Sequence, residues 1–82
     1  MTTQDIHQKL LKIVKTYLPQ DVDPSSITPE AHLMKNLNIN SAHLVDIALD
    51  VEDAFDITLN EADMAAMETV ENVVTIVQGK LG

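Results

Sequence analysis

The sequence predicts an all-α protein, a small four-helix bundle with a long loop between helices one and two and a short third helix. Apolar residues recur three or four positions apart in several segments, which is the spacing of one helix face. Only Tyr17 and Phe55 are aromatic, so we expect a core of aliphatic side chains. The β-branched run 73–77 is compatible with a strand, but no second strand candidate could pair with it. A chain of 82 residues can bury one modest core, and residues 1–82 are therefore expected to form a single domain.

The first helix is predicted to run from about Thr3 to Tyr17. Thr2 or Thr3 can cap its start. It is expected to end before Pro19, because the residue before a proline is disfavoured in helical geometry. Its apolar stripe consists of Ile6, Leu10, Ile13, Val14 and Tyr17.

The connection from Pro19 to Asn40 is long for a small domain and contains three prolines. Its apolar residues indicate a loop that is fixed to the core, with a short turn near Pro29 to Met34, rather than a free linker. These anchors are Ile27, Leu33, Met34, Leu37 and Ile39.

The second helix is predicted from Ser41 to about Asp56. Its core face has the helical spacing i, i+3, i+4, i+7 and i+11. The residues of that face are Leu44, Ile47, Ala48, Val51 and Phe55.

Two shorter helices are predicted to follow. Asn60 can cap a third helix from Glu61 to about Met67, with Asp63 placed for a capping box. Thr69 can cap a fourth helix, and Gly79 is a plausible stop for it. The apolar stripe of the fourth helix is Val70, Val73, Val74 and Val77.

The charges are distributed unevenly. The net charge is -8, nine of the thirteen acidic residues lie between Asp46 and Glu71, and no basic residue occurs between Lys35 and Lys80. This distribution argues against nucleic acid as a partner and favours proteins with basic surfaces. The chain has no cysteine, which excludes disulfides and thiolate chemistry. No apolar run reaches the length of a membrane span, so we expect a cytoplasmic protein. We also expect a monomer.

Ser41 begins the acidic second helix, and no catalytic base, metal motif or glycine-rich phosphate loop accompanies it. A helix N-terminus favours negative charge, so a phosphodiester on this hydroxyl would be stabilised there. The outer side of the same helix combines a narrow apolar strip with carboxylates, which fits an apolar groove edged by basic residues. The residues expected to bind partners are Ala42, Val45, Asp46, Leu49, Asp50, Glu52 and Asp53.

The stretch from Leu37 to Ile57 resembles the prosthetic-group site of acyl carrier proteins. The resemblance implies that Ser41, preceded by Asn40, carries a 4'-phosphopantetheine arm donated from coenzyme A. It also implies two kinds of partner: a phosphopantetheinyl transferase, and acyl-transferring and ketosynthase-type enzymes with basic docking patches. Helices two and three are expected to part around an acyl chain. The candidate lining residues are Leu44, Ile47, Val51, Met64, Met67, Val70 and Val73.

One departure from the family pattern concerns the serine's neighbours. Most members have Asp-Ser-Leu where this chain has Asn40-Ser41-Ala42. Asn40 can still cap the helix, but it lacks the negative charge that a transferase could pair with a cation. We interpret this change as the mark of a specialised carrier, for a polyketide, an aryl polyene or an unusual lipid rather than for housekeeping fatty acid synthesis.

Three other functions compete with the acyl carrier. An aminoacyl or peptidyl carrier would share the bundle and the serine, and an unmodified interaction adaptor would keep only the fold. A calcium-binding module is suggested by Asp21 and Asp23, but Ser26 and His32 replace the glycine and glutamate of an EF-hand loop. An enzyme is not expected, because the three histidines lie in separate segments and are interpreted as solvated side chains.

Overall fold

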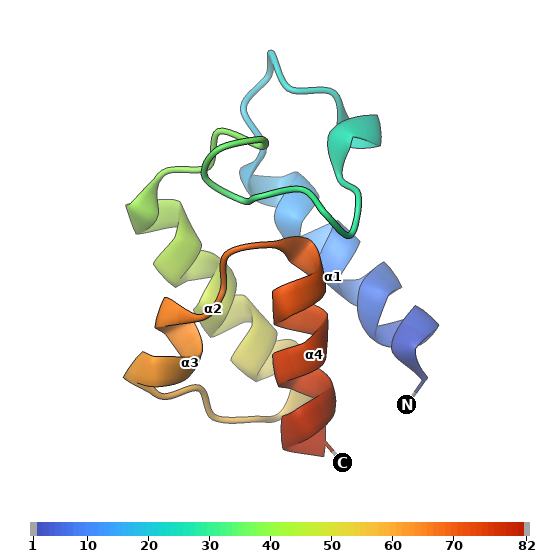
Figure 1. Ribbon diagram of the computed structural model, residues 1–82, viewed down its shortest axis with the longest axis vertical. Helices are drawn as coiled ribbons and strands as arrows, with labels where there is room; N and C mark the ends of the chain where they lie inside the picture. Colours follow the sequence, from blue (N-terminus) through green and yellow to red (C-terminus); the bar gives the residue numbers. More distant parts are fainter. Residues whose placement is uncertain (1, 82) are drawn as a thin grey trace.

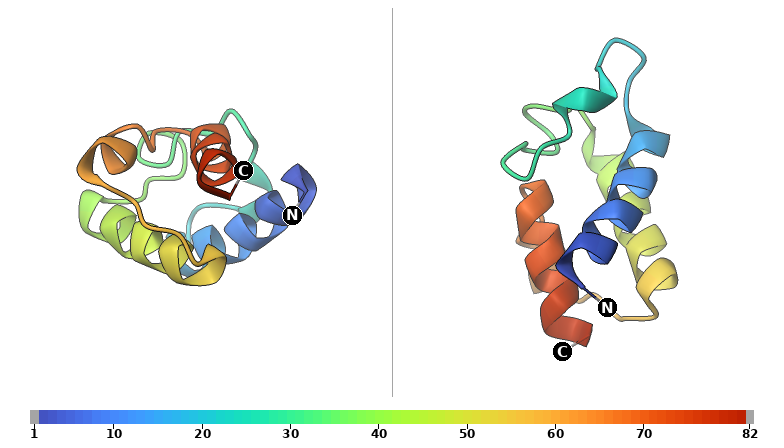
Figure 2. Two further views of the ribbon diagram at one scale, coloured as in Figure 1. Left: turned by 90° about the horizontal axis from the view of Figure 1, so that it is seen from below. Right: turned by 90° about the vertical axis from the view of Figure 1, so that its right-hand side faces the viewer.

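A computed structural model describes residues 2–81 and contains four α-helices and one 3-10 helix (Figure 1). The elements are α1 (Thr3–Tyr17), η1 (Pro24–Ser26), α2 (Ser41–Phe55), α3 (Glu61–Ala65) and α4 (Val70–Leu81). α1 packs against both α2 and α4, and the long loop crosses one end of the helices (Figures 1 and 2). The predicted all-α bundle is therefore confirmed.

The core consists of Phe55 and of aliphatic side chains from every α-helix except α3, together with side chains from the loops. α1 contributes Ile6, Leu10 and Val14, all at most 1% exposed. The stripe predicted for α4 is fully buried, and so is that of α2 except for Leu44, which is half-buried. The remaining two members of the α1 stripe, Ile13 and Tyr17, are also half-buried.

Local hydrogen bonds fix where the helices begin. Thr2 and Asp5 form a capping box at α1, and Asn60 and Asp63 form the predicted one at α3. At α4 the Thr69 hydroxyl accepts a hydrogen bond from the backbone N–H of Asn72 at 3.1 Å. Each predicted cap is a short polar side chain that satisfies an otherwise unpaired N–H of the first turn.

Two predicted helix ends are wrong, and a third is off by one residue. α2 ends at Phe55 because Asp56 adopts the left-handed conformation, with φ of 54°. α3 ends at Ala65 rather than Met67, and Met67 turns into the core, where it is 2% exposed. α4 continues past Gly79 to Leu81, because this glycine does not adopt a positive φ and so does not end the helix.

The long loop is fixed to the bundle, as predicted, by side chains and by backbone hydrogen bonds. Leu33 donates its N–H to the carbonyl of Glu68 at 2.9 Å, and Val70 donates to Ala31 at 3.1 Å. Met34 is an exception among the predicted anchors, since it is 44% exposed. Turns occupy residues 29–30 and 33–36, within and just beyond the predicted turn region. The sequence did not indicate η1, which begins at a proline with Asp23 as its cap.

Candidate functional site

Ser41 is the first residue of α2, and it lies at the end of the bundle that the long loop covers (Figure 1). Its side chain is exposed and makes no hydrogen bond within residues 2–81. The preceding backbone is well anchored, because Ile39 is 2% exposed and donates its N–H to the carbonyl of Leu33 at 3.0 Å. Asn38 has φ of 56°, a left-handed conformation that asparagine tolerates better than most residues. An exposed hydroxyl is thus presented from a fixed position.

The first turn of α2 fits an anionic group attached to Ser41. The Asn40 side chain accepts a hydrogen bond from the N–H of His43 at 2.8 Å, and Leu44 donates to the Asn40 carbonyl at 3.0 Å. The N–H groups of Ser41 and Ala42 have no intrahelical acceptor, as at every helix start. They and the positive end of the helix dipole favour a negative phosphodiester at this corner.

The predicted apolar strip on the outer side of α2 is exposed to solvent. Val45 is 45% exposed and Leu49 is 56% exposed, and Ala42 is also exposed. Asp46 and Asp53 are exposed beside the strip and form no ion pair within residues 2–81. The surface combines unpaired carboxylates with uncovered aliphatic groups, a composition suited to a partner with basic and apolar side chains.

Two of the predicted partner-binding acids have contacts inside the protein. The hydroxyl of Tyr17 donates to Oδ2 of Asp50 at 2.6 Å. The N–H of Leu59 donates to Oε2 of Glu52 at 2.7 Å, and Glu52 is half-buried. These bonds join α2 to α1 and to the loop before α3, so both acids have a structural task besides any contact with a partner.

Tyr17 is a site residue that the sequence indicated only as a member of the apolar stripe. The hydrogen bond to Asp50, partial burial and the negative charges of Asp50 and Asp46 raise its pKa from 10.0 to about 12. Its ring lies 5.6 Å from the ring of His43, with 48° between the two planes. The sequence signal that could have indicated this contact is the position of Tyr17 in the last turn of the helix. A tyrosine there can pack its apolar ring on a neighbour and donate a hydrogen bond from its hydroxyl group.

The predicted acyl-pocket residues lie together between α2, α3 and α4, but they are tightly packed. Leu44 and Met64 are half-buried, whereas the other members are at most 2% exposed. The buried members are Ile47, Val51, Met67, Val70 and Val73. Parting of α2 and α3 around a guest chain stays a prediction.

Asp23, one of the two aspartates considered for calcium, is the cap of η1. The Asp23 carboxylate accepts the N–H of Ser25 at 2.9 Å, and this bond lowers the pKa of Asp23. Between residues 2 and 81 no three His, Asp or Glu side chains form a group that could hold a metal ion. Within the same span, no helix has the length and hydropathy that a membrane crossing requires.

The interpretation of all three histidines as solvated is wrong for two of them. The Nδ1 atom of His32 accepts hydrogen bonds from the N–H groups of Met34 and Lys35, both at 3.2 Å. The Nε2 atom of His7 is buried without a hydrogen-bond partner. Only His43 is exposed, and it lies against Tyr17.

Comparisons with known proteins agree with this geometry. Residues 8–77 match the protein family described as "Phosphopantetheine attachment site". The chain is 34% identical to the acyl carrier protein of Thermotoga maritima, over 96% of this chain and 95% of that one. It is 39% identical to the meromycolate extension acyl carrier protein of Mycobacterium leprae, over 70% of this chain and 50% of that one.

The fold matches a solved structure as well. The acyl carrier protein from Enterococcus faecalis superimposes with a TM-score of 0.80 at 25% identity, over 98% of this chain and 99% of that one. Both the sequence match and the structural match extend over most of the bundle, well beyond the segment around Ser41. The chain therefore belongs to the acyl carrier protein family, whose members bear a covalent 4'-phosphopantetheine arm.

Proposed function

We propose that Ser41 is the residue to which the arm is attached and that the outer side of α2 docks partner enzymes. The protein acts as an acyl carrier, and a phosphopantetheine arm supplies the thiol on which acyl groups form thioesters. The observation that carries the proposal is the exposed, unbonded hydroxyl at the start of α2. Ser25 and Ser26, the other two serines of the chain, both lie in η1 instead.

The chain itself supplies position and recognition. The fixed backbone before Ser41 holds the attachment point still, and the first turn of α2 stabilises negative charge there. Tethering raises the effective concentration of the cargo at each partner enzyme. The thioester chemistry takes place in those enzymes, and residues 1–82 act as one monomeric carrier domain in the cytoplasm.

Docking is the task of the exposed strip of Val45 and Leu49 and of the acids beside it. Asp46 and Asp53 have no internal partner within residues 2–81 and can pair with basic residues of an enzyme. Asp50 and Glu52 each keep one carboxylate oxygen outside the internal bond and can contribute more weakly. The partners are a phosphopantetheinyl transferase and acyl-transferring or ketosynthase-type enzymes.

We further propose a specialised lipid or polyketide pathway for the cargo. Asn40 and Ala42 replace the acidic and larger apolar residues that usually flank the serine. Asn40 retains the cap through its bond to His43, so the change removes charge from the recognition surface without loss of the helix start. The relative from Mycobacterium leprae is named for meromycolate extension, which is consistent with specialised lipids among relatives of this chain.

The test is the intact mass of the protein after incubation with coenzyme A and a broad-specificity phosphopantetheinyl transferase. The native chain should gain one phosphopantetheine, and Ser41→Ala should gain none. The variant Ser25→Ala/Ser26→Ala, which removes the other two serines, should gain one as the native chain does. Asn40→Asp should be modified at a higher rate if the transferase pairs a cation with that side chain.

Two results would contradict the assignment. A mass gain on Ser41→Ala would place the arm on another residue. An unmodified native chain together with an unmodified Asn40→Asp/Ala42→Leu variant would mean that Ser41 does not accept the arm, because the usual flanking residues would then be present. Circular dichroism of each variant checks that the helices are retained.

A further inference from the structure

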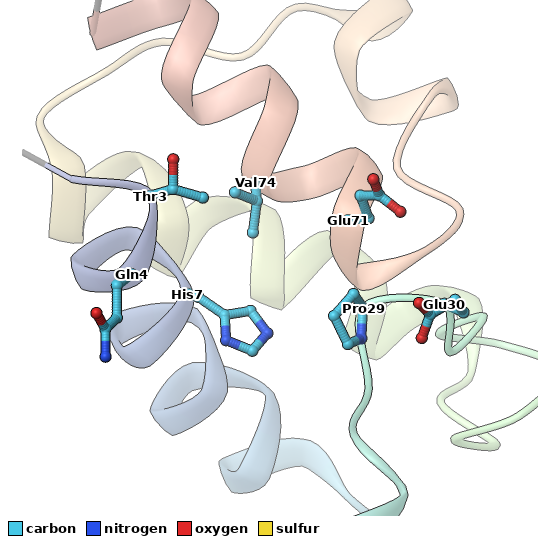
Figure 3. A pocket seen from close by; sticks show the side chains of 7 residues that line it. All are labelled: Thr3, Gln4, His7, Pro29, Glu30, Glu71 and Val74. Carbon is cyan, nitrogen blue, oxygen red and sulfur yellow. The ribbon is translucent and has the colours of Figure 1, made fainter.

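A hollow of about 470 Å³ lies between α1, the first turns of α4 and the long loop, and no residue of α2 lines it (Figure 3). His7 from α1 and Pro29 from the loop stand on either side of it, with Val74 from α4 above them in the view. Thr3 stands at one end, and Glu71 from α4 and Glu30 from the loop stand at the other. We refer to the space lined by these six residues and Gln4 as the α1–α4 groove.

The walls of the α1–α4 groove are bonded to one another. Glu71 donates its N–H to the carbonyl of Pro29 at 2.9 Å, which ties the loop to the first turn of α4. At the opposite end, Gln78 donates a side-chain hydrogen bond to the hydroxyl of Thr3 and joins α4 to α1. Because three segments hold each other in place, the groove exists before any ligand arrives.

Three polar groups in the groove, those of Glu30, Glu71 and His7, have no hydrogen-bond partner within residues 2–81. Neither carboxylate, of Glu30 or of Glu71, forms a hydrogen bond or an ion pair within residues 2–81. The Nε2 atom of His7 is buried and also has no partner. In Figure 3 this atom lies on the side of the ring that faces Pro29. With its proton on Nδ1, His7 offers an acceptor at Nε2, so all three groups can accept hydrogen bonds.

We propose that the α1–α4 groove binds an arginine side chain of a partner protein. Arginine has an apolar stem, which fits Pro29 and Val74, and a charged head, which fits the two carboxylates. Its guanidinium group has five N–H donors and no acceptor, which complements the three acceptors of Glu30, Glu71 and His7. An anionic ligand or a nucleic acid is disfavoured by the two acids and by the net charge of -8. The groove gives the protein a second interaction surface that does not depend on modification of Ser41.

The test uses ¹⁵N-labelled Ser41→Ala protein, so that no arm can take part. The protein is titrated with the peptide acetyl-Ala-Arg-Ala-amide and, separately, with the same peptide containing citrulline, which has the shape of arginine without its charge. The arginine peptide should cause saturable shifts of the amides of His7, Glu30 and Glu71. The citrulline peptide should bind about tenfold or more weakly, because hydrogen bonds to a charged donor are the stronger ones.

A matched pair of double variants locates the binding site. Glu30→Gln/Glu71→Gln should abolish the shifts around the groove. Glu61→Gln/Glu68→Gln removes the same charge, also from the first turn of a helix and from an exposed connection, and should leave them unchanged. All four residues are exposed, so the fold should survive each substitution.

Several results would overturn the proposal. Equal affinity for the citrulline peptide would show that the groove recognises the shape of the side chain and not its charge. Shifts of equal size along the acids of α2 would show diffuse electrostatic attraction. Groove shifts that depend on protein concentration without any peptide would show that a second copy of the chain occupies the site. Persistence of the shifts in Glu30→Gln/Glu71→Gln would place the binding elsewhere.

Discussion

Helices α2 and α3 both begin after an asparagine cap, but they are held in the bundle by different forces. α2 has fifteen residues and buries four of them: Ile47, Ala48, Val51 and Phe55. α3 has five residues, and none of them is buried. The capping box of Asn60 and Asp63 fixes only the start of α3, and the helix is joined to the rest of the bundle by the half-buried Met64 and by an ion pair of 2.8 Å between Lys80 and Asp63.

The difference between α2 and α3 indicates which helix holds Ser41 in a fixed position and which helix is more easily displaced. Buried apolar area is the main stabilising contribution to α2, so its position is coupled to global folding. Exposed polar bonds are weaker, and segments that depend on them open at a lower free energy. We therefore expect the helix that begins at Ser41 to be the fixed platform, and displacement of α3 around a cargo stays a prediction.

The largest expected effect comes from removal of a buried side chain of α2. Ile47→Ala should lower the free energy of unfolding by about 2–5 kcal/mol, because it leaves a cavity in the core. Met64→Ala, in the half-buried position of α3, should cost about 1 kcal/mol. Urea unfolding followed by circular dichroism measures both. If Ile47→Ala does not fold, Ile47→Val should still cost about 0.5–1.5 kcal/mol, and equal losses at both helices would remove the contrast.

The next effect concerns the bond that fixes α2 to α1. The chain has one tyrosine and no tryptophan, so ultraviolet absorbance reports Tyr17 alone. Its midpoint should lie near pH 12 rather than 10.0, and Asp50→Asn should move it back toward 10.0. Because the pKa is raised in the folded state, the bond stabilises the fold fully below pH 10.0 and loses this contribution as the pH rises through about 12. A native midpoint at the ordinary value would mean that the bond does not form in solution.

A smaller effect is expected when charge is removed from the docking side of α2. Asp46→Asn/Asp53→Asn should raise the KM of the phosphopantetheinyl transferase about three- to tenfold with little change in kcat, since each exposed ion pair contributes about 0.2–1 kcal/mol. The matched control is Glu61→Gln/Glu68→Gln, which removes two exposed acids at α3 and in the connection after it. If both double variants raise KM equally, net charge rather than the α2 surface governs recognition.

The smallest effect tests the attachment of α3. Lys80→Met should accelerate hydrogen exchange of the amides of α3 and leave those of α2 unchanged, because it breaks the ion pair with Asp63. That ion pair and the bond from Asn60 lower the pKa of Asp63, so their stabilising contribution is present above the ordinary aspartate pKa and is lost as the pH falls below it. Lys15→Met, in the last turn of α1, is the control. Unchanged exchange in α3 would show that its position depends on Met67 instead.

The site was predicted from the sequence to the extent that it depends on residues close together in the chain. Ser41 was recognised as the start of a helix, with Asn40 as its cap, because capping involves side chains and N–H groups three positions apart. The exposure of Val45 and Leu49 followed from rotation of the helix relative to its apolar stripe. Neither inference needed a neighbouring element.

The errors occur where a distant segment takes part. Gly79 was taken as a stop, but α4 continues and brings Lys80 to Asp63, which lies seventeen positions earlier in the chain. Partner binding by Glu52 stays a prediction, but its bond to the N–H of Leu59 was not foreseen. Met67 was predicted to belong to the third helix, but that helix ends at Ala65 and Met67 is buried in the core.

The sequence by itself determined the class of fold, the four helices with most of their boundaries and the place of Ser41 at the start of α2. These features depend on spacing, caps and prolines, whose effects act within one or two turns of chain. Only the tertiary structure decided that Tyr17 holds Asp50 and that Glu30, Glu71 and His7 meet in one groove. Contacts of this kind depend on which elements become neighbours, and that is set by the packing of the whole core rather than by any local pattern.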